Sequence, residues 1–465
     1  MAKEVIHLSD HFTYRKILKF VLSSVLMMVL TSLYWIVDGF FLSNYVSTSA
    51  FAGVNLIFPV IMIVSAVGFM FGTGGAALVS KRLGEGNRDL ANRTFSLITY
   101  TTFVVGIVFS VAFFFLVTPI AEAFAKINSV ETSKEMIDSA SLYGRIMIGG
   151  VSLFAMQGYF HAFFSVNEKA FHGFLFTLFA GITNMLLDLL LVGILKLGVV
   201  GAATASLCGF FLGSIGPYIY FRFKKDNLIR LGRTKIVFKD IGQSALNGIS
   251  ELVSDISGSV VTIVYNIQLL KYLGEAGVTA YGVIGYVCFV FFAVFIGFAI
   301  GITPVIGYNF GAKNSKELTN VTNKSLVIVA ITGVLMSGIA IGLSGPFAYL
   351  FTNSSETLFQ LSFRAMMIYS ICYVFSGVAM FGSAFFTALN NGLISAFISL
   401  TRTLVFQISF VFILPLIMGE DGIWTSIVIA EALSMILTMS LMLLHQKKYN
   451  YQLFKSSRTI ESSLE

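Results

Sequence analysis

Long apolar runs separated by short polar stretches make up most of the chain. A run of about 20 apolar residues is long enough to cross the bilayer as a helix. We identify twelve such runs, and several exceed a minimal span, which favours tilted helices. The pattern predicts an all-α polytopic membrane protein with spans at 16–42, 51–80, 94–118, 140–164, 170–195, 200–221, 241–270, 277–308, 324–350, 358–386, 393–417 and 423–445.

Short motifs recur in the same order in the two halves of the chain. In one matched pair of motifs, which begin at residues 83 and 310, corresponding positions are all separated by the same number of residues. The separation in the other two pairs is nearly the same. Chance matches in Gly-rich apolar sequence are the simpler alternative. Two six-span halves would share one orientation, as in parallel-repeat transporters. The matched pairs are Leu83-Gly84-Glu85-Gly86-Asn87 with Phe310-Gly311-Ala312-Lys313-Asn314, Ala155-Met156-Gln157-Gly158 with Ala379-Met380-Phe381-Gly382, and Gly201-Ala202-Ala203-Thr204 with Gly422-Ile423-Trp424-Thr425.

This repeat predicts two six-helix lobes. We place an N-lobe at 1–221 (spans 1–6), a basic cytoplasmic linker at 222–240, a C-lobe at 241–446 (spans 7–12) and a cytoplasmic tail at 447–465. A cleft between two such lobes is a natural path for a substrate.

Composition and charge agree with a membrane location. Hydrophobic residues make up 56% of the chain and charged residues 11%, against about 25% charged in soluble domains. Lys and Arg concentrate in alternate loops and at both termini, which predicts a multi-pass plasma-membrane protein with both termini in the cytoplasm. The net charge of +7 therefore says little about nucleic acid, which we do not expect as a partner. Cys208, Cys288 and Cys372 all lie in apolar runs and are expected to act as small hydrophobic residues.

Two aspartates lie inside expected spans, near their outer ends. Placing an ionised carboxylate in the bilayer core costs at least about 2.5–3.5 kcal/mol, so Asp38 and Asp188 are candidate functional residues. Asn184 lies one helical turn before Asp188, and Thr204 and Ser206 lie at the same depth in the sixth span. These oxygen ligands suit Na⁺, or a carboxyl group that takes up H⁺. The alternative for Asp38 is a local hydrogen bond near the membrane interface.

A second group of polar residues provides weaker candidates for substrate binding or a second ion. Glu251 and Asp255 are one turn apart in the seventh span, and Glu431 lies in the twelfth. Gln157 in the fourth span and Tyr265 in the seventh are further candidates, because aromatic faces can bind organic cations. The alternative for Glu251 is a hydrated position near the cytoplasmic end of its helix.

With these residues in view, the chain resembles the MATE (multidrug and toxic compound extrusion) family, of prokaryotic type and within the MOP flippase superfamily. The resemblance rests on the two halves, on Ile36-Val37-Asp38, on Asn184 to Asp188, on Gly201-Ala202-Ala203-Thr204 and on the paired loops after spans 2 and 8. It implies a monomeric Na⁺- or H⁺-coupled antiporter whose N-lobe cation site uses Asp38, Asn184, Asp188 and a hydroxyl of Thr204 or Ser206. The chain departs from many members by lacking a proline in the first span, where it reads Phe20-Val21-Leu22-Ser23.

The expected function is export of amphipathic, cationic organic compounds by alternating access, without a cofactor. No Walker A pattern is present in the sequence, so an ion gradient is the expected energy source. The partners are then small organic substrates and membrane lipid. The first alternative is a flippase for lipid-linked saccharides, which would need a basic cavity. The second is a polytopic membrane enzyme, but the short loops carry no catalytic constellation, so we do not expect an enzyme.

Overall fold

The computed structural model describes residues 6–127, 133–352 and 356–454, and all regular secondary structure in those ranges is helical. The first group of elements is α1 (Tyr14–Tyr45), α2 (Thr48–Gly84), α3 (Arg88–Ile127), α4 (Lys134–Gly149), α5 (Val151–Val166), α6 (Ala170–Asp188), η1 (Leu189–Ile194) and α7 (Gly198–Phe223). The second group is α8 (Phe238–Gly311), α9 (Ser315–Gly342), α10 (Ser344–Thr352), α11 (Glu356–Tyr369), η2 (Ser370–Cys372), α12 (Tyr373–Ala388), α13 (Gly392–Leu400), η3 (Thr401–Phe406), α14 (Gln407–Ile413), α15 (Pro415–Met418), α16 (Glu420–Leu444) and α17 (Gln446–Tyr449).

The prediction of an all-α polytopic membrane protein is confirmed. Within the described ranges, ten helices are long and apolar enough to cross a membrane, and α4 with α5 forms an eleventh span bent by 54°. The helix α8 is two spans joined at Gly274, whose φ of 62° breaks the helix without a loop, and this accounts for the twelfth. A φ of this sign costs glycine little, because it has no Cβ.

Some boundaries differ from those expected from hydropathy. The ninth span was expected to run to residue 350, but α9 ends at Gly342 and the short helix α10 follows. The fourth span bends at Gly150, and the third continues through Pro119 as far as Ile127. Hydropathy averages over many residues, so it does not detect a bend or a short additional helix.

Side-chain caps begin several of the helices. Thr13 accepts a hydrogen bond from the backbone N–H of Lys16, and Ser47 from that of Ala50. Asn314 accepts one from the Glu317 N–H at the start of α9. These bonds satisfy amide groups that have no partner within the first helical turn.

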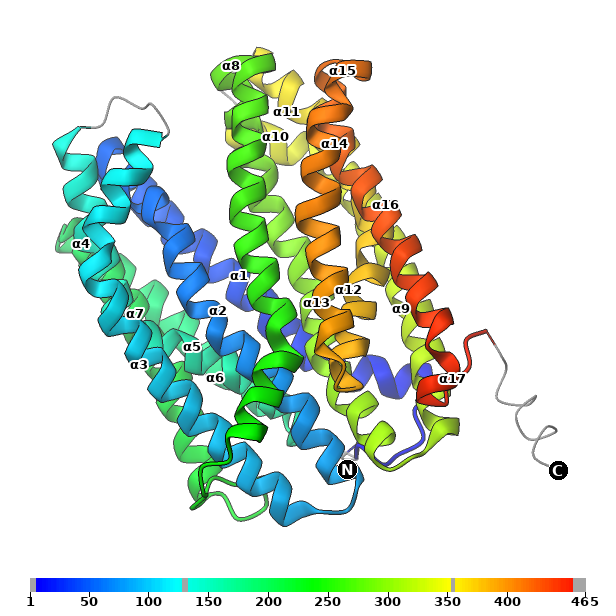
Figure 1. The fold of residues 1–465 in the computed structure, drawn as a ribbon. Helices are drawn as coiled ribbons and strands as arrows, with labels where there is room; N and C mark the ends of the chain where they lie inside the picture. Colours follow the sequence, from blue (N-terminus) through cyan, green and yellow to red (C-terminus); the bar gives the residue numbers. More distant parts are fainter. Residues whose placement is uncertain (1–5, 128–132, 353–355, 455–465) are drawn as a thin grey trace.

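The spans form an N half (α1 to α7) and a C half (α8 to α17), which lie beside each other and approach most closely at one end (Figure 1). Two buried apolar clusters each lie within one half, around Trp35 and around Trp424. The third cluster contains residues of both halves, including Phe71 and Phe298, and joins them. We call the end where the halves meet the closed end. Both ends of the described chain lie there, because the segment after α16 and the segment before α1 both contact α9 (Figure 1).

The closed end is held by reciprocal backbone contacts. A Cβ added at Gly84 would lie 2.0 Å from the Tyr308 carbonyl oxygen, and one added at Gly311 would lie 2.0 Å from the Lys81 carbonyl oxygen. Gly84 and Gly311 are separated by the same number of residues as the two loop motifs, and so are Lys81 and Tyr308. The two halves therefore meet through an approximate two-fold relation, as an isologous interface does.

The segment before α1 bridges the two halves at this end. The carboxylate of Glu168, in the loop between α5 and α6, accepts from the Leu8 N–H and lies 2.7 Å from the His7 Nδ1. The carboxylate of Glu317, in the first turn of α9, accepts from the Phe12 N–H at 2.8 Å and lies 2.7 Å from the His11 Nδ1. We call residues 6–13 the N-terminal strap.

Candidate functional site

The first site is a buried polar cluster in the N half. The Ser206 hydroxyl of α7 donates to Asp38 Oδ1 of α1 at 3.3 Å and accepts from Asn184 Nδ2 of α6 at 3.4 Å. The side chain of Asp38 is 4% exposed, and those of Asn184 and Ser206 are also buried. The first helix and the neighbouring helices α6 and α7 thus bring together three of the expected cation-site residues.

Asp188 is the last residue of α6 and is fully buried. Among the described residues neither of its carboxylate oxygens has a hydrogen-bond partner, nor has Asn184 Oδ1. Asp188 and Asp38 are close enough to repel each other. A buried carboxylate without a hydrogen-bond partner is costly, so the cluster has the electrostatic character of a site for a proton or a cation.

The π-helix η1 begins directly after Asp188. A π-helical turn inserts an extra residue into a helix and is common at functional sites. The sequence provides no sign of η1, because its residues Leu189 to Ile194 are apolar and read as ordinary helix.

Gln157 and Tyr34 extend the cluster toward the closed end. Gln157 Nε2 donates to the Tyr34 hydroxyl at 3.4 Å, and Gln157 Oε1 has no partner among the described residues. Both side chains, with Asn184 and Ser206, line a cavity of about 10 Å³, which is close to the space that one water-sized species needs. Gln157, expected as a candidate for substrate binding or a second ion, is therefore placed beside the residues expected to bind the first ion.

Thr204 does not join the cluster. Its hydroxyl donates to the Val200 carbonyl at 2.7 Å, and its side chain is exposed on α7. Residues 204 and 206 lie about 200° apart around a helix, so only one of them can face Asp38.

Tyr143 of α4 was not identified from the sequence. Its hydroxyl is buried, has no hydrogen-bond partner in the described part of the chain, and lies close enough to interact with both Asp38 and Asp188. The only sign of Tyr143 in the sequence is a polar group within an apolar run. Because the chain has 18 tyrosines, that sign does not single it out.

A cleft of about 590 Å³ lies between the halves, beside Asp38. Cavities of about 300–1,000 Å³ are typical of sites for small organic ligands. Asp38 and Tyr143 line it from the N half, and Tyr281 and Tyr286 from the C half. The remaining lining residues are Trp35, Ile36, Gly39, Leu42, Phe51, Val54, Asn55, Phe58, Thr262, Asn266, Val278, Gly282, Gly285 and Phe289. Seven of the eighteen lining residues are therefore aromatic, and no Lys or Arg is among the described lining residues.

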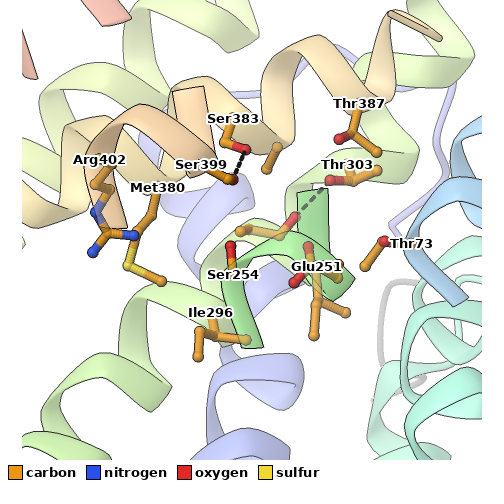
Figure 2. A pocket seen from close by; sticks show the side chains of 13 residues that line it. Thr73, Glu251, Ser254, Ile296, Thr303, Met380, Ser383, Thr387, Ser399 and Arg402 are labelled. Carbon is orange, nitrogen blue, oxygen red and sulfur yellow. Dashed lines mark hydrogen bonds between the residues drawn. The ribbon is translucent and has the colours of Figure 1, made fainter. Parts of the chain in front are cut away.

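A second polar pocket, of about 60 Å³, is lined by residues of the C half and by Thr73 of α2 in the N half (Figure 2). Glu251 of α8 lies near Thr73 and Thr303, and Arg402 of η3 lies at the opposite side (Figure 2). The hydroxyls of Ser254, Ser383, Thr387 and Ser399 complete its polar wall. Asp255 lies one turn beyond Glu251, is exposed, and does not line the pocket.

Glu431 is not a free carboxylate. Arg402 Nε donates to both of its oxygens at 2.9 Å, and Glu431 is fully buried. Breaking such a buried pair typically costs about 3–5 kcal/mol, and the sequence pattern did not predict that Arg402 would be the partner of Glu431.

Tyr265 occupies the position in the C half that corresponds to Asp38 in the N half. The two positions are related by the offset of the paired loop motifs. The Tyr265 hydroxyl lies 2.7 Å from the Ser426 hydroxyl, as Asp38 lies beside Ser206. The C half therefore has a neutral phenol–hydroxyl pair where the N half has a carboxylate–hydroxyl pair. At these two corresponding positions, only the N half has a buried acidic side chain.

Comparison with known proteins gives consistent matches over most of the chain. The MatE family model matches residues 23–190 and 252–413. The multidrug export protein MepA of Staphylococcus haemolyticus is 20% identical over 94% of this chain and 95% of its own. An FAD transporter of Shewanella oneidensis is 22% identical over 85% of this chain and 87% of its own. A solved outward-facing MATE family transporter of the MOP superfamily is 21% identical, with a TM-score of 0.89 over 97% of this chain and 99% of that one.

Proposed function

Because this chain belongs to the MatE family, we propose that it is a cation-coupled antiporter that exports amphipathic organic cations by alternating access. The coupling ion is Na⁺ or H⁺. The observation that carries this proposal is the position of Asp38. One carboxylate belongs both to the buried cluster with Ser206 and to the wall of the cleft between the halves.

The buried cluster supplies a binding site for the coupling ion. Asp38, Asp188, Asn184 Oδ1 and the Ser206 hydroxyl are all oxygen donors, which suits Na⁺, or H⁺ carried by a carboxyl group. A bound cation would relieve the repulsion between the two carboxylates. Ion binding therefore stabilises the arrangement in which Asp38 faces Ser206.

The lining of the cleft favours a cationic substrate that binds against aromatic rings. Its aromatic lining provides ring faces, on which an organic cation is stabilised by cation–π attraction. Its only charged lining residue among those described is Asp38. A pyrophosphate would find an acid and no base there, which argues against the flippase for lipid-linked saccharides.

Coupling follows from the shared carboxylate. When a cation occupies the buried cluster, Asp38 is neutralised, and an organic cation in the cleft loses its counter-charge. The two ligands then compete for one charge, so entry of the ion promotes release of the substrate. Such exchange requires that each ligand bind the two conformations with different affinity.

We also propose the orientation and the domain boundaries. The closed end carries the basic residues Lys81, Arg82 and Arg88, so it faces the cytoplasm together with both termini. The cleft beside Asp38 then belongs to the outward-facing state. The N-lobe is 1–221, the C-lobe 241–446, and the protein acts as a monomer in the plasma membrane.

The test is ethidium efflux from proteoliposomes driven by an inward Na⁺ gradient or, separately, by an inward pH gradient. We expect efflux under one gradient, and we expect Asp188→Asn to reduce it to background while the purified protein stays monodisperse. Asp226→Asn is the matched control, because Asp226 lies in the loop after α7 and is 75% exposed. Normal gradient-driven efflux from Asp188→Asn would overturn the assignment, and absence of efflux under both gradients would favour the flippase.

A further inference from the structure

A groove of about 420 Å³ lies on the side of the bundle, between α1 of the N half and α8 and α9 of the C half. Apart from Arg15, Lys19 and Thr332, every residue that lines it is aliphatic or aromatic. The groove is distinct from the polar pocket of the C half and from the cleft beside Asp38, since it shares no lining residue with them.

The groove opens toward the hydrocarbon of the membrane. Leu18 and Leu22, on its α1 wall, are 50% and 54% exposed within a membrane-spanning helix. Phe295 and Phe298 form its buried floor on α8. An occupant would therefore enter sideways from the bilayer rather than from water.

The dimensions of the groove correspond to one leaflet. Its α1 wall extends from Arg15 to Val25, which is about 15 Å along a helix with a rise of about 1.5 Å per residue. That is about half of the ~30 Å hydrocarbon core. The two cationic residues lie at the closed end of this wall, one turn apart, at the level where head groups begin.

Within the part of the chain that the structure describes, the two cations have no ion-pair partner. Neither Arg15 nor Lys19 pairs with a carboxylate there, although Lys16, between them, lies 3.3 Å from the Asp10 carboxylate. Both side chains are exposed at the mouth of an apolar groove. Basic pockets between transmembrane helices on the cytoplasmic side typically bind anionic head groups.

We propose that this groove binds one anionic glycerophospholipid, with its phosphate at Arg15 and Lys19 and an acyl chain along the groove toward Thr332. The bound lipid contacts α1 of one half and α8 and α9 of the other. It therefore stabilises the arrangement of the halves in which the groove has this shape.

The test uses the full-length protein in detergent micelles with phosphatidylglycerol, with phosphatidylcholine of the same acyl chains, or with inorganic phosphate. Lipid retention is measured by native mass spectrometry, and stability by thermal melting. We expect retention of phosphatidylglycerol and a rise in Tm of about 3 °C or more, with a smaller effect of phosphatidylcholine and none of phosphate.

Three variants separate the contributions. Arg15→Gln with Lys19→Gln should remove the preference for phosphatidylglycerol, and Thr332→Phe, which fills the groove and leaves both cations, should reduce retention of either lipid. Lys16→Gln is the matched control and should behave as the unmodified protein. The proposal is overturned if the double variant keeps the preference, if Thr332→Phe retains lipid normally, or if phosphate alone reproduces the rise in Tm.

Discussion

At the scale of single residues, the buried acids differ in whether their carboxylates have hydrogen-bond or ion-pair partners. Asp38 has one bond, from Ser206, while Asp188 has none among the described residues. The Glu431 carboxylate, which is equally buried, is satisfied by Arg402. Asp188 and Glu431 are thus both fully buried, but only Glu431 is next to a fixed cation.

The contrast between Ser206 and Thr204 provides a matched test at this scale. Ser206→Ala removes a hydrogen bond to a carboxylate, a type of bond that contributes about 1.5–3 kcal/mol. The ion concentration for half-maximal ethidium efflux should therefore rise about tenfold or more. Thr204→Ala removes only a bond to the helix backbone and should leave that concentration unchanged. Equal effects of the two substitutions would contradict the placement of Ser206 in the ion site.

At the scale of elements, the N-terminal strap is short and has no regular structure of its own, yet it bridges both halves. Leu8 and Phe12 are fully buried, and their backbone N–H groups donate to Glu168 and Glu317 respectively. The same Glu317 carboxylate also accepts from Asn320 Nδ2 at 2.8 Å. This acid in the first turn of α9 therefore anchors the strap to the C half, together with Asn320 and Lys324, which donate to the Phe12 carbonyl.

Neutralising this anchor should destabilise the closed end. We expect Glu317→Gln to lower the free energy of unfolding by about 1–3 kcal/mol, because charge-assisted hydrogen bonds are replaced by weaker neutral ones. The measurement is thermal melting together with proteolysis of the segment before α1. Glu85→Gln is the control at the same end: its surface pair with Lys81, at 3.8 Å, is expected to contribute less than about 1 kcal/mol. An unchanged melting temperature of Glu317→Gln would show that this carboxylate does not stabilise the closed end.

At the scale of the whole molecule, the two halves contact each other through related surfaces. A Cβ at Gly74 would lie 2.5 Å from the Gly248 backbone nitrogen, and one at Gly301 would lie 3.1 Å from the Val21 Cα. These two contacts are again related by the offset of the paired loop motifs. Close contact of backbones through glycine is typical of helix packing in membranes, and here it occurs at the interface that would open in the alternating access proposed above.

Adding a single methyl group at this interface should disfavour the closed end. Gly84→Ala would place a Cβ against the Tyr308 carbonyl. Overpacking of this kind costs about 1–3 kcal/mol, or about 5- to 150-fold in the ratio of closed to open states. The measurement is maleimide labelling of Ser80→Cys, a buried position at the closed end, in a background without the native cysteines.

The two-fold relation predicts that Gly311→Ala increases labelling in the same direction as Gly84→Ala. Gly242→Ala is the control, because nothing lies within 4 Å of a Cβ added there. If labelling of Ser80→Cys did not respond to either substitution, the closed end would not be the moving interface.

The sequence by itself determined the membrane class, the twelve spans and their arrangement in two halves, because these depend on local hydropathy and on recurring motifs. It also located Asp38, Asn184 and Asp188 within their spans, because a charge in an apolar run is visible without a fold. Only the tertiary structure decided that Ser206 rather than Thr204 faces Asp38, that Tyr143 lies beside both aspartates, and that Arg402 neutralises Glu431. These outcomes depend on how each helix is rotated against its neighbours, and packing between residues far apart in the chain fixes that rotation.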